Sequence, residues 1–485
     1  MKIENLFKYY SPLSADVEPN LEITNISTHS GSIKPGGLFF AFRGEKKDGI
    51  NYIKDAKQNG AVAAVCRMIP EDSVLPVIVA VDMRLALSRW SAAFYNFPAE
   101  KLNIIGVTGT NGKTTITTLI YRIFSAGQEK GGLIGTSGYR YGQKSGKFRM
   151  TTPEPHELHY IFSKMLQEGV RNVVMEVSSH ALAFKRVDDI KFSSAVFTNL
   201  TRDHLDFHRN FENYFKSKLK IFSLLKDSAS AAIVNIDDKY GRRIIEELDG
   251  KNVITYGVDR RADYRGIIKK LDITGSVFKL ENRGRDRGKV EMDLIGKFNI
   301  YNALAAIACA VEGGIKMEKA CKIISHADPV AGRLEIAAKK TKGEKQVIID
   351  YAHTPDALDN VLLTLKSMTG GRLITVFGCG GDRDRAKRPL MGKVAGIYSD
   401  KVYLTSDNPR SEDPVKILLD IELGIRKTRA PYVVIPDREE AIKNALSDAG
   451  PGDCVLIAGK GDEEVQIIGD KEIPFSDRKA AGRYM

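Results

Sequence analysis

A glycine-rich loop between an apolar run and an amphipathic segment constrains the fold of this chain more than any other feature. The loop spans residues 106–115, with the sequence Gly-Val-Thr-Gly-Thr-Asn-Gly-Lys-Thr-Thr. A short apolar, β-branched run, 102–107, leads into it, and apolar side chains then recur at helical spacing from Ile116 to Phe124. The pattern predicts a strand, a tight loop and a helix, an arrangement that holds an anion at a helix N-terminus.

The residue types in the loop suit the phosphates of a nucleoside triphosphate. Gly109 and Gly112 let the backbone turn so that successive N–H groups face an anion. Lys113 can reach the outer phosphates, and the Thr114 hydroxyl can hold Mg²⁺. The general P-loop pattern is not met, because Val107 occupies the position of its first glycine. The alternative is a glycine-rich turn that happens to end in Lys-Thr; the flanking strand and helix favour nucleotide binding.

Size and charge set wider bounds. The chain has 485 residues, of which 43% are hydrophobic and 28% charged, enough for about three domains of ordinary size. With 73 basic and 61 acidic residues the formal charge is +12, which favours anionic partners: nucleotides, nucleic acid or an anionic membrane surface. No basic block is long enough to choose between them.

Cysteine usage and hydropathy indicate the compartment. The five cysteines are scattered without a paired motif, which is typical of a reducing cytoplasm: Cys66, Cys309, Cys321, Cys379 and Cys454. Residues 1–20 contain no apolar core of signal-peptide length, and no run of about eighteen apolar residues occurs. We therefore expect a cytoplasmic protein that is not membrane-spanning. The sequence carries no signal for assembly, and a monomer is expected.

Alternating strand and helix patterns divide the chain into three. Residues 1–100 predict a small α/β domain. In residues 101–333 strands alternate with helices behind the loop, which predicts a mostly parallel sheet with ligand-binding loops at the carboxyl ends of its strands. The alternation restarts in residues 334–485 and predicts a Rossmann-like domain. The expected fold class is α/β.

Two further segments carry polar groups at predicted strand ends. Glu176 lies near the end of the apolar run 173–177, where a helix cap or a surface charge is the ordinary interpretation. A phosphate-binding loop needs a carboxylate for its Mg²⁺, so Glu176 is the candidate. Residues 201–208 contain two histidines, two aspartates and an arginine. A transition-metal site is possible there, but no third ligand follows at zinc-like spacing, which favours Mg²⁺-phosphate chemistry.

These segments together resemble one family. Residues 108–114, Thr-Gly-Thr-Asn-Gly-Lys-Thr, are similar to the nucleotide loop of the Mur ligases and the related folylpolyglutamate synthetases, and residues 201–206, Thr-Arg-Asp-His-Leu-Asp, resemble a Mur ligase signature. The resemblance covers essentially the whole chain. It implies an ATP- and Mg²⁺-dependent ligase of cytoplasmic peptidoglycan precursor synthesis. The implied substrates are UDP-MurNAc-L-Ala-D-Glu and meso-diaminopimelate, joined through an acyl phosphate.

The resemblance also implies roles for residues around the nucleotide. It places the following at ATP: Gly109, Thr110, Asn111, Gly112, Lys113, Thr114, Thr115, Asn299, Asn302, Arg333 and Asp350. Catalysis would rest on Lys113, with two Mg²⁺ held by Thr114, Glu176, His204 and a carbamylated Lys218. From the residues alone, Lys216, Lys218 and Lys220 are indistinguishable, and only the family's Tyr-x-x-Ala-Lys segment selects Lys218.

The muramoyl-dipeptide would contact two parts of the chain. The implied residues are Ser30, Glu45, Lys46, Lys47, Thr151, Thr152, Ser178 and Arg186. Three positions depart from the family pattern: His29 and Gly31 replace the Asp and Arg that flank the serine, and Phe184 replaces a glutamine.

The acceptor amino acid would be held by the third domain. The residues implied are Arg383, Asp407, Asn408, Pro409, Arg410, Gly459 and Glu463, whereas Asp462 replaces the family's histidine. Arg410 offers a distal carboxylate a bidentate fork and would repel the bare ammonium of lysine. An L-lysine-adding ligase is the alternative within the family. A nucleotide-dependent nucleic-acid-binding protein is the alternative outside it, and leaves residues 201–208 and 407–410 unexplained.

Overall fold

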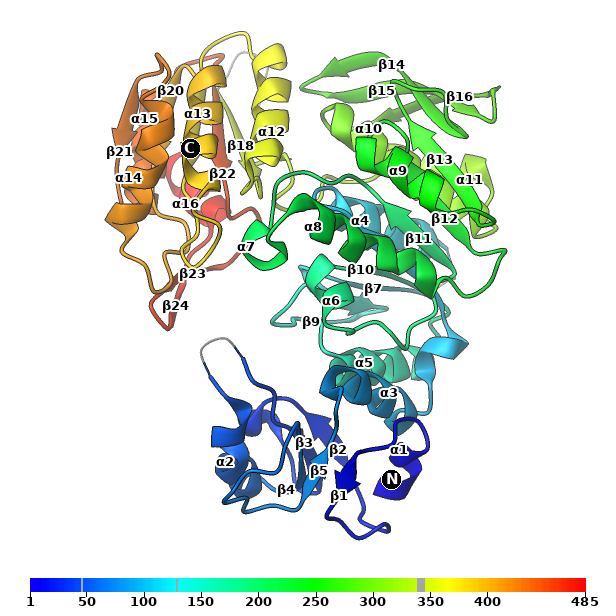
Figure 1. Ribbon diagram of the computed structural model, residues 1–485. Coiled ribbons are helices and arrows are strands. Elements are labelled where there is room, and N and C mark those ends of the chain that lie inside the picture. Colours follow the sequence, from blue (N-terminus) through cyan, green and yellow to red (C-terminus); the bar gives the residue numbers. More distant parts are fainter. Residues whose placement is uncertain (45–46, 128–129, 338–344) are drawn as a thin grey trace.

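Three large β-sheets with packed helices follow one another along the chain in the computed structural model, and a two-stranded hairpin forms a separate small sheet (Figure 1). The structure describes residues 1–44, 47–127, 130–337 and 345–485. The predicted α/β class with three units is confirmed. The divisions at 100/101 and 333/334 stay a prediction. Within the described residues, no helix has the length and apolar character that crossing a membrane would need.

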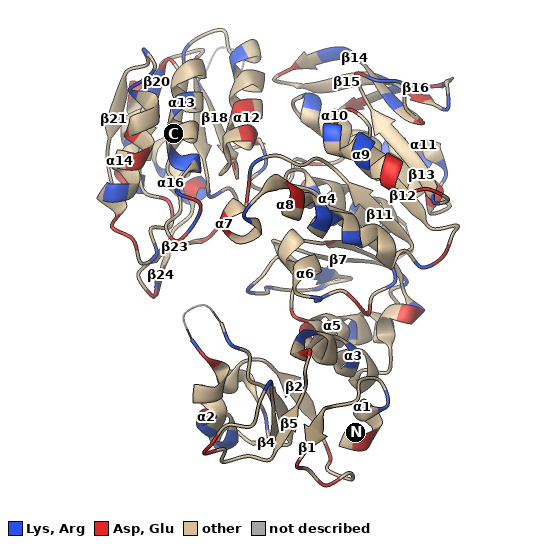
Figure 2. Cartoon of the chain, viewed as in Figure 1, with Lys and Arg blue, Asp and Glu red and all other residues tan. Residues whose placement is uncertain are grey.

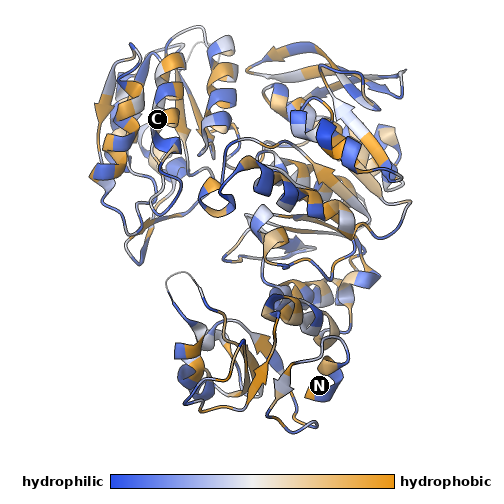
Figure 3. Cartoon of the chain, viewed as in Figure 1, coloured by the Kyte–Doolittle hydropathy of each residue, from blue (hydrophilic) through white to orange (hydrophobic). Residues whose placement is uncertain are grey.

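The N-terminal unit is a five-stranded sheet in the order β1-β5-β4-β3-β2. Its strands are β1 (Ser14–Ala15), β2 (Asn25–Ser27), β3 (Gly37–Phe40), β4 (Ala61–Cys66) and β5 (Val77–Val79). Its helices are α1 (Ile3–Phe7), α2 (Ile53–Gln58) and α3 (Met83–Phe94), with 3-10 turns η1 (Ser30–Ser32), η2 (Gly49–Tyr52) and η3 (Pro98–Lys101). Hydrophobic residues concentrate in the strands (Figure 3), and Trp90 of α3 is fully buried against them.

The central unit is an eleven-stranded sheet with a parallel middle. Its parallel strands are β7 (Gly131–Gly135), β10 (Asn172–Glu176), β6 (Asn103–Thr108), β11 (Ser194–Phe197), β12 (Ala231–Asn235), β13 (Asn252–Gly257) and β14 (Tyr264–Asp272). Antiparallel strands extend both edges: β8 (Gly138–Tyr141) and β9 (Lys144–Gly146) beside β7, and β15 (Gly275–Asn282) and β16 (Arg285–Met292) beside β14. The loop predicted to bind phosphate follows β6, between neighbours β10 and β11.

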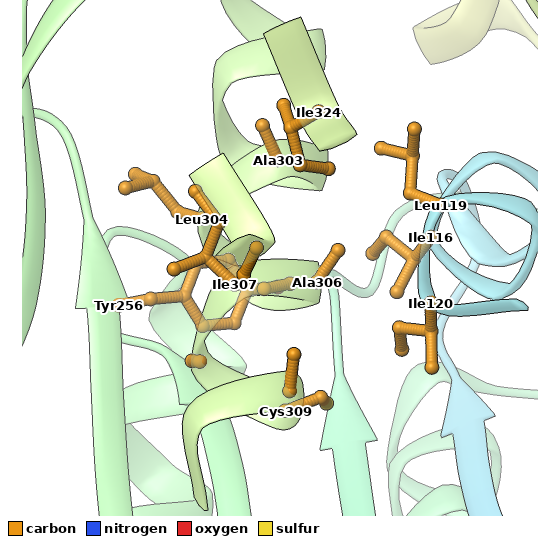
Figure 4. Close-up of a cluster of buried hydrophobic side chains, with 14 of the residues drawn as sticks. Ile116, Leu119, Ile120, Tyr256, Ala303, Leu304, Ala306, Ile307, Cys309 and Ile324 are labelled. Carbon is orange, nitrogen blue, oxygen red and sulfur yellow. The ribbon is translucent and has the colours of Figure 1, made fainter. Parts of the chain in front are cut away.

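Helices cover both faces of the central sheet. They are α4 (Lys113–Phe124), α5 (Pro155–Gln167), α6 (Ser179–Ala183), α7 (Leu205–His208), α8 (Phe211–Leu219), η4 (Lys220–Leu224), α9 (Lys239–Glu247), α10 (Lys297–Glu312) and α11 (Met317–Ser325). The apolar stripe predicted for α4 faces α10, where Leu119 lies among the buried side chains of both helices (Figure 4). Alanines such as Ala303 and Ala306 on α10 leave room for this close approach. This packing holds the start of α4, and with it the loop, in place.

The C-terminal unit is a six-stranded sheet in the order β17-β18-β22-β19-β20-β21. Its strands are β17 (Glu335–Ile336), β18 (Gln346–Asp350), β19 (Leu373–Phe377), β20 (Lys401–Leu404), β21 (Tyr432–Val434) and β22 (Cys454–Ala458), and all but β17 are parallel. Its helices are α12 (Pro355–Met368), α13 (Lys387–Tyr398), α14 (Pro414–Ile425), α15 (Arg438–Asp448) and α16 (Asp477–Tyr484); a hairpin, β23 (Val465–Ile468) and β24 (Lys471–Pro474), stands apart. This is the Rossmann-like sheet that the sequence predicts.

Candidate active site

A cleft of about 750 Å³ is lined by both the central and the C-terminal units. The central unit contributes the loop after β6, the end of β10, the segment after β11 and the start of α10. The C-terminal unit contributes segments that follow β18, β19, β20 and β22. Ligand loops at the carboxyl ends of parallel strands are the usual binding positions in such sheets, and here two sheets direct theirs into one space.

The loop after β6 adopts a backbone that depends on its glycines. Gly109 has φ +147° and Gly112 has φ +88°, a region that L side chains rarely adopt. A Cβ at Gly109 would lie 1.8 Å from Thr198 Oγ1, and one at Gly112 would lie 2.7 Å from Asn302 Oδ1. Gly112 caps α4, so the helix N-terminus opens into the cleft. The geometry matches a turn built around an anion.

Lys113 stays within this loop. Its Nζ donates to the carbonyls of Gly109 at 2.9 Å and Thr110 at 2.7 Å. Burial lowers the pKa of its ammonium, and the carboxylates of Glu176 and Asp203 act in the opposite direction. A buried ammonium whose acceptors are loop carbonyls is positioned to exchange them for phosphate oxygens.

Residues at and just beyond the hinge, the junction of the central and C-terminal units around residue 333, contact the loop. Arg333 Nη2 donates to Thr114 Oγ1 at 3.2 Å, and its guanidinium lies 4.3 Å from the centre of the Tyr351 ring. Asn111 Nδ2 donates to Asp356 Oδ2 at 2.8 Å. Asp350 accepts hydrogen bonds from the backbone of Leu334 and Ala352, so it fixes the chain just after Arg333.

The two asparagines predicted at the nucleotide are not equivalent. Asn302 lines the cleft, whereas Asn299 does not. Asn299 is buried behind it, where its Oδ1 accepts from Asn302 Nδ2 at 2.9 Å and its Nδ2 donates to Ile295 O. Asn299 therefore orients Asn302, and the predicted contact of Asn299 with the nucleotide stays a prediction.

Oxygen and nitrogen donors for a cation lie around the same loop. Glu176 is buried at the end of β10 and accepts from Thr136 N at 2.9 Å and Thr136 Oγ1 at 3.2 Å. His204 Nε2 lies 3.3 Å from Asp203 Oδ2. Burial lowers the pKa of the His204 imidazole to about 3. A neutral imidazole is the form that binds a metal.

Lys218 is a fully buried lysine beside these groups. Its Nζ donates to Gly109 O at 2.8 Å and lies 4.6 Å from the centre of the Tyr214 ring. Burial, and then the Lys113 ammonium, lower its pKa well below the usual value. Across the part of the chain that the structure describes, no three His, Cys, Asp or Glu side chains form a ready-made metal site. A carbamate on Lys218 would supply the additional oxygen donors, and a neutral amine is the form that reacts with CO₂.

The residues predicted at the muramoyl-dipeptide separate into two groups. Thr151 and Ser178 line the cleft. Thr152 is buried and donates to Glu176 O at 2.9 Å, and Arg186 donates to Glu154 and to Thr152 O, so both build the wall behind the cleft. Their predicted contact with the muramoyl-dipeptide stays a prediction; in this structure each side chain makes hydrogen bonds within the protein.

The N-terminal part of the prediction lies outside this cleft. Ser30 begins the 3-10 turn η1, and His29 Nδ1 accepts from Gly31 N at 3.1 Å, so the histidine that departs from the family pattern caps this turn. Lys47 is exposed, 6.0 Å from the centre of the Tyr52 ring. Glu45 and Lys46 lie outside the described residues.

Phe184 belongs to an interface that the sequence did not predict. Its ring lies 4.8 Å from the guanidinium of Arg84 on α3 and 5.7 Å from that of Arg186. Arg84 also pairs with Glu154 at 3.3 Å, joining the N-terminal and central units. Sequence offers no signal for this cluster, because its members are separated along the chain and follow no shared motif.

The residues predicted for the acceptor come together on the side of the cleft formed by the C-terminal unit, which we call the acceptor end. Arg383, Asp407, Asn408, Arg410, Gly459 and Glu463 line it; Pro409 does not. Arg410 donates from Nη1 to Gly381 O at 2.9 Å. Gly459 has φ +116°, and a Cβ there would lie 2.5 Å from Asp407 Oδ2. The glycine thus allows the loops after β20 and β22 to meet.

Asp462, which departs from the family pattern, contacts the central unit. Its Oδ2 accepts from Ser137 Oγ at 3.1 Å, and nearby Lys147 pairs with Glu464 at 2.7 Å. Ser137 follows Thr136, which binds Glu176. The acceptor segment therefore docks on the same turn that orients the candidate metal ligand.

Comparisons with known proteins agree along the whole chain. Residues 22–95 match the model "Mur ligase family, catalytic domain", residues 107–310 match "Mur ligase middle domain", and residues 332–461 match "Mur ligase, glutamate ligase domain". The UDP-N-acetylmuramoyl-L-alanyl-D-glutamate–2,6-diaminopimelate ligase of Caldanaerobacter subterraneus subsp. tengcongensis is 46% identical, over 95% of this chain and 94% of the relative. Ligase 1 of that name from Clostridium acetobutylicum is 43% identical, over 96% and 95%.

A solved structure agrees with these relatives. It carries the same ligase name, is 32% identical, covers 100% of this chain and 99% of its own, and superposes with a TM-score of 0.66. The aligned regions span nearly the full length of the chain and so include all three units. The chain therefore belongs to the Mur ligase family.

Proposed function

We propose that this chain is an ATP-dependent ligase that adds meso-diaminopimelate to the D-glutamate of UDP-MurNAc-L-Ala-D-Glu. The relatives named above carry this activity in their names. One observation carries the proposal: the nucleotide loop and the arginines Arg383 and Arg410 line one cleft. A phosphate donor and an acceptor with an extra carboxylate can therefore meet there.

The central unit would activate the substrate. Loop N–H groups and Lys113 bind the phosphates, while Arg333 reaches them from the hinge. Mg²⁺ held by Thr114, Glu176, His204 and carbamylated Lys218 would neutralise charge on the transferring group. An oxygen of the D-glutamate γ-carboxylate forms a bond to the γ-phosphorus of ATP, while the bond between that phosphorus and the β,γ-bridging oxygen breaks. ADP leaves with that oxygen, and an acyl phosphate remains.

The C-terminal unit would deliver the amine. Arg383 and Arg410 bind the distal carboxylate of diaminopimelate, and Glu463 binds its distal ammonium. The free amine at the other end attacks the acyl carbon, the carbon–oxygen bond to phosphate breaks, and the amine loses a proton. Holding both reactants in one cleft lowers the entropic part of the barrier. Thr151 and Ser178 position the dipeptide.

Cell compartment and assembly belong to the same proposal. The five cysteines are free thiols, which supports a reducing cytoplasm. A monomeric enzyme is part of the same proposal.

The test is phosphate release from Mg-ATP with the UDP-muramoyl-dipeptide present and either meso-diaminopimelate or L-lysine added. Release with diaminopimelate alone supports reaction and acceptor together. Release with lysine alone would overturn the acceptor assignment while retaining the ligase. Release with neither would overturn the proposed function, and a reaction without dipeptide controls for plain ATP hydrolysis.

Nucleic-acid-binding proteins usually carry basic residues clustered on one face. In the view of Figure 2 basic and acidic residues are interspersed over all three units. This distribution gives no support to the nucleic-acid alternative.

A further inference from the structure

Lys460 is a buried cation behind the acceptor end of the cleft. Its side chain is 0% exposed, although it lies between Gly459 and Glu463, which both line the cleft. Its Nζ donates to Asn408 Oδ1 at 3.0 Å and to Glu463 Oε2 at 2.9 Å. A buried lysine is costly unless its charge is paired, and here Glu463 and Asn408 are its two partners.

Both partners of Lys460 belong to the acceptor site. Asn408 donates from Nδ2 to the same Glu463 oxygen at 2.9 Å, and its Oδ1 also accepts from Ile467 N at 3.0 Å. The Tyr351 hydroxyl donates to the other oxygen, Oε1, at the longer distance of 3.3 Å. Oε2 thus receives two short hydrogen bonds from behind. Oε1 retains acceptor capacity, and the Glu463 side chain is 31% exposed.

We propose that Lys460 is a positioning residue that presents Glu463 and Asn408 to the acceptor and selects a distal end carrying both an ammonium and a carboxylate. The proposal rests on the proposed function, which it deepens by naming a source of acceptor specificity. Lys460 itself does not line the cleft, so it acts through its two partners.

The charge balance gives the reason for selectivity. Arg383, Arg410 and Lys460 bring three positive charges to the acceptor end. Asp407 and Glu463, with Asp382, whose charge also acts on Arg410, bring three negative charges. An acceptor ammonium at Glu463 shares this carboxylate with the Lys460 ammonium, and like charges in a partly buried site repel. The distal ammonium of either acceptor adds one positive charge to this balance; diaminopimelate also brings a distal carboxylate that offsets it, whereas lysine does not.

The experiment compares Lys460→Met with Lys471→Met, an exposed lysine on β24. In Lys460→Met we expect kcat/KM for meso-diaminopimelate to fall about tenfold or more, because Glu463 loses its short ion pair. The ratio of kcat/KM between diaminopimelate and lysine should also fall. The KM for ATP should stay within twofold, and Lys471→Met should match the wild type in all three.

Coupling to Glu463 separates positioning from a general loss of structure. In a Glu463→Gln background, Lys460→Met should change kcat/KM for diaminopimelate less than twofold, because the group through which it acts is already altered. A full additional loss there would overturn the proposal, as would unchanged acceptor kinetics in Lys460→Met. Where Lys460→Met does not fold, Lys460→Gln replaces it, since its amide keeps a donor in place while removing the charge.

The outcomes also distinguish this inference from the function beneath it. Wild-type phosphate release with diaminopimelate tests the ligase proposal without reference to Lys460. If the wild type is active and both Lys460 variants retain normal acceptor discrimination, the inference fails alone. If the wild type accepts neither amino acid, the proposed function fails first.

Discussion

Single residues in the nucleotide loop are constrained by backbone geometry as well as by chemistry. Gly109 and Gly112 both adopt φ values that favour glycine, and both lie against side chains of neighbouring segments. At the acceptor end the equivalent position is Gly459, which lies against Asp407. Replacing such a glycine can therefore destabilise the protein in two ways: the new residue strains the backbone, and its Cβ lacks space.

Gly112 and Gly314 form a matched pair that separates these two effects. Both have φ +88°, but a Cβ at Gly112 would lie 2.7 Å from Asn302 Oδ1, while nothing lies within 4 Å at Gly314. We expect Gly314→Ala to cost about 1 kcal/mol of unfolding free energy with a normal ATP KM. Gly112→Ala should in addition raise the ATP KM about tenfold or more. Similar ATP KM values in the two variants would contradict a steric role for Gly112.

Arg410 tests the acceptor assignment at a single side chain. Arg410→Ala should raise the KM for diaminopimelate about 10- to 100-fold, because a charge-assisted hydrogen bond contributes about 1.5–3 kcal/mol. The KM for ATP should change less than twofold. Residue 410 has a positive φ of 52°, and this holds for both variants. Arg410→Lys keeps the charge but loses the planar guanidinium, so its affinity for diaminopimelate should lie between those of Arg410→Ala and the wild type. Equal rises in both KM values would count against Arg410 as the acceptor anchor.

At the scale of elements, buried polar contacts join segments that the apolar cores alone do not align. Arg438 at the start of α15 pairs with Asp477 of α16 at 2.7 Å, with both side chains fully buried. Arg438 also donates to Ser406 O and Ala458 O. Those residues directly precede the loops that contain Asp407 and Gly459. The ion pair thus holds two acceptor loops at once.

Two ion pairs between the same helices allow a controlled comparison. Arg438→Met leaves Asp477 buried without its partner, which should cost about 3–5 kcal/mol. Arg483 and Glu439 pair at 2.7 Å between α16 and α15, with side chains 52% and 36% exposed. Arg483→Met should cost about 0–1 kcal/mol. Thermal or denaturant unfolding of both variants measures the difference, and equal costs would show that burial is not what matters.

At the scale of the whole molecule, the cleft exists because two sheets present their loops to each other. Contacts that hold them so include Arg333 to Thr114, Ser137 to Asp462 and Asn111 to Asp356. The last is between the nucleotide loop and the start of α12. We therefore expect ATP binding to depend on the position of the C-terminal unit, in part through the Asn111–Asp356 hydrogen bond.

Asp356 is the residue through which this link can be tested. Asp356→Ala should raise the ATP KM about 2- to 10-fold, because a hydrogen bond of this kind contributes about 0.5–1.5 kcal/mol. Ser367→Ala, an exposed change on the same helix, is the control. Isothermal titration with ATP and no other substrate gives the same comparison at equilibrium. An unchanged affinity in Asp356→Ala would show that the contact does not contribute to nucleotide binding.

Prediction from the sequence succeeded where the signal was local. The strand, loop and helix around residues 106–115 follow from hydrophobic period and glycine placement, and both are properties of adjacent residues. Asn299, Thr152, Arg186 and Pro409 are predicted at ligands but do not line the cleft in this structure, so their ligand contacts stay predictions. Their residue types are right for binding, but their orientation depends on partners distant in sequence, such as Glu154 for Arg186.

The sequence by itself determined the α/β class, the phosphate-binding turn and the family, because periodicity, glycine positions and motifs lie along one dimension. Only the tertiary structure decided which side chains share the cleft and which support it. It also brought Asn111 to Asp356 and Lys460 to Asn408. The physical reason is that buried charges and hydrogen bonds are satisfied by whichever groups the packed sheets bring near, and that proximity is not encoded in spacing.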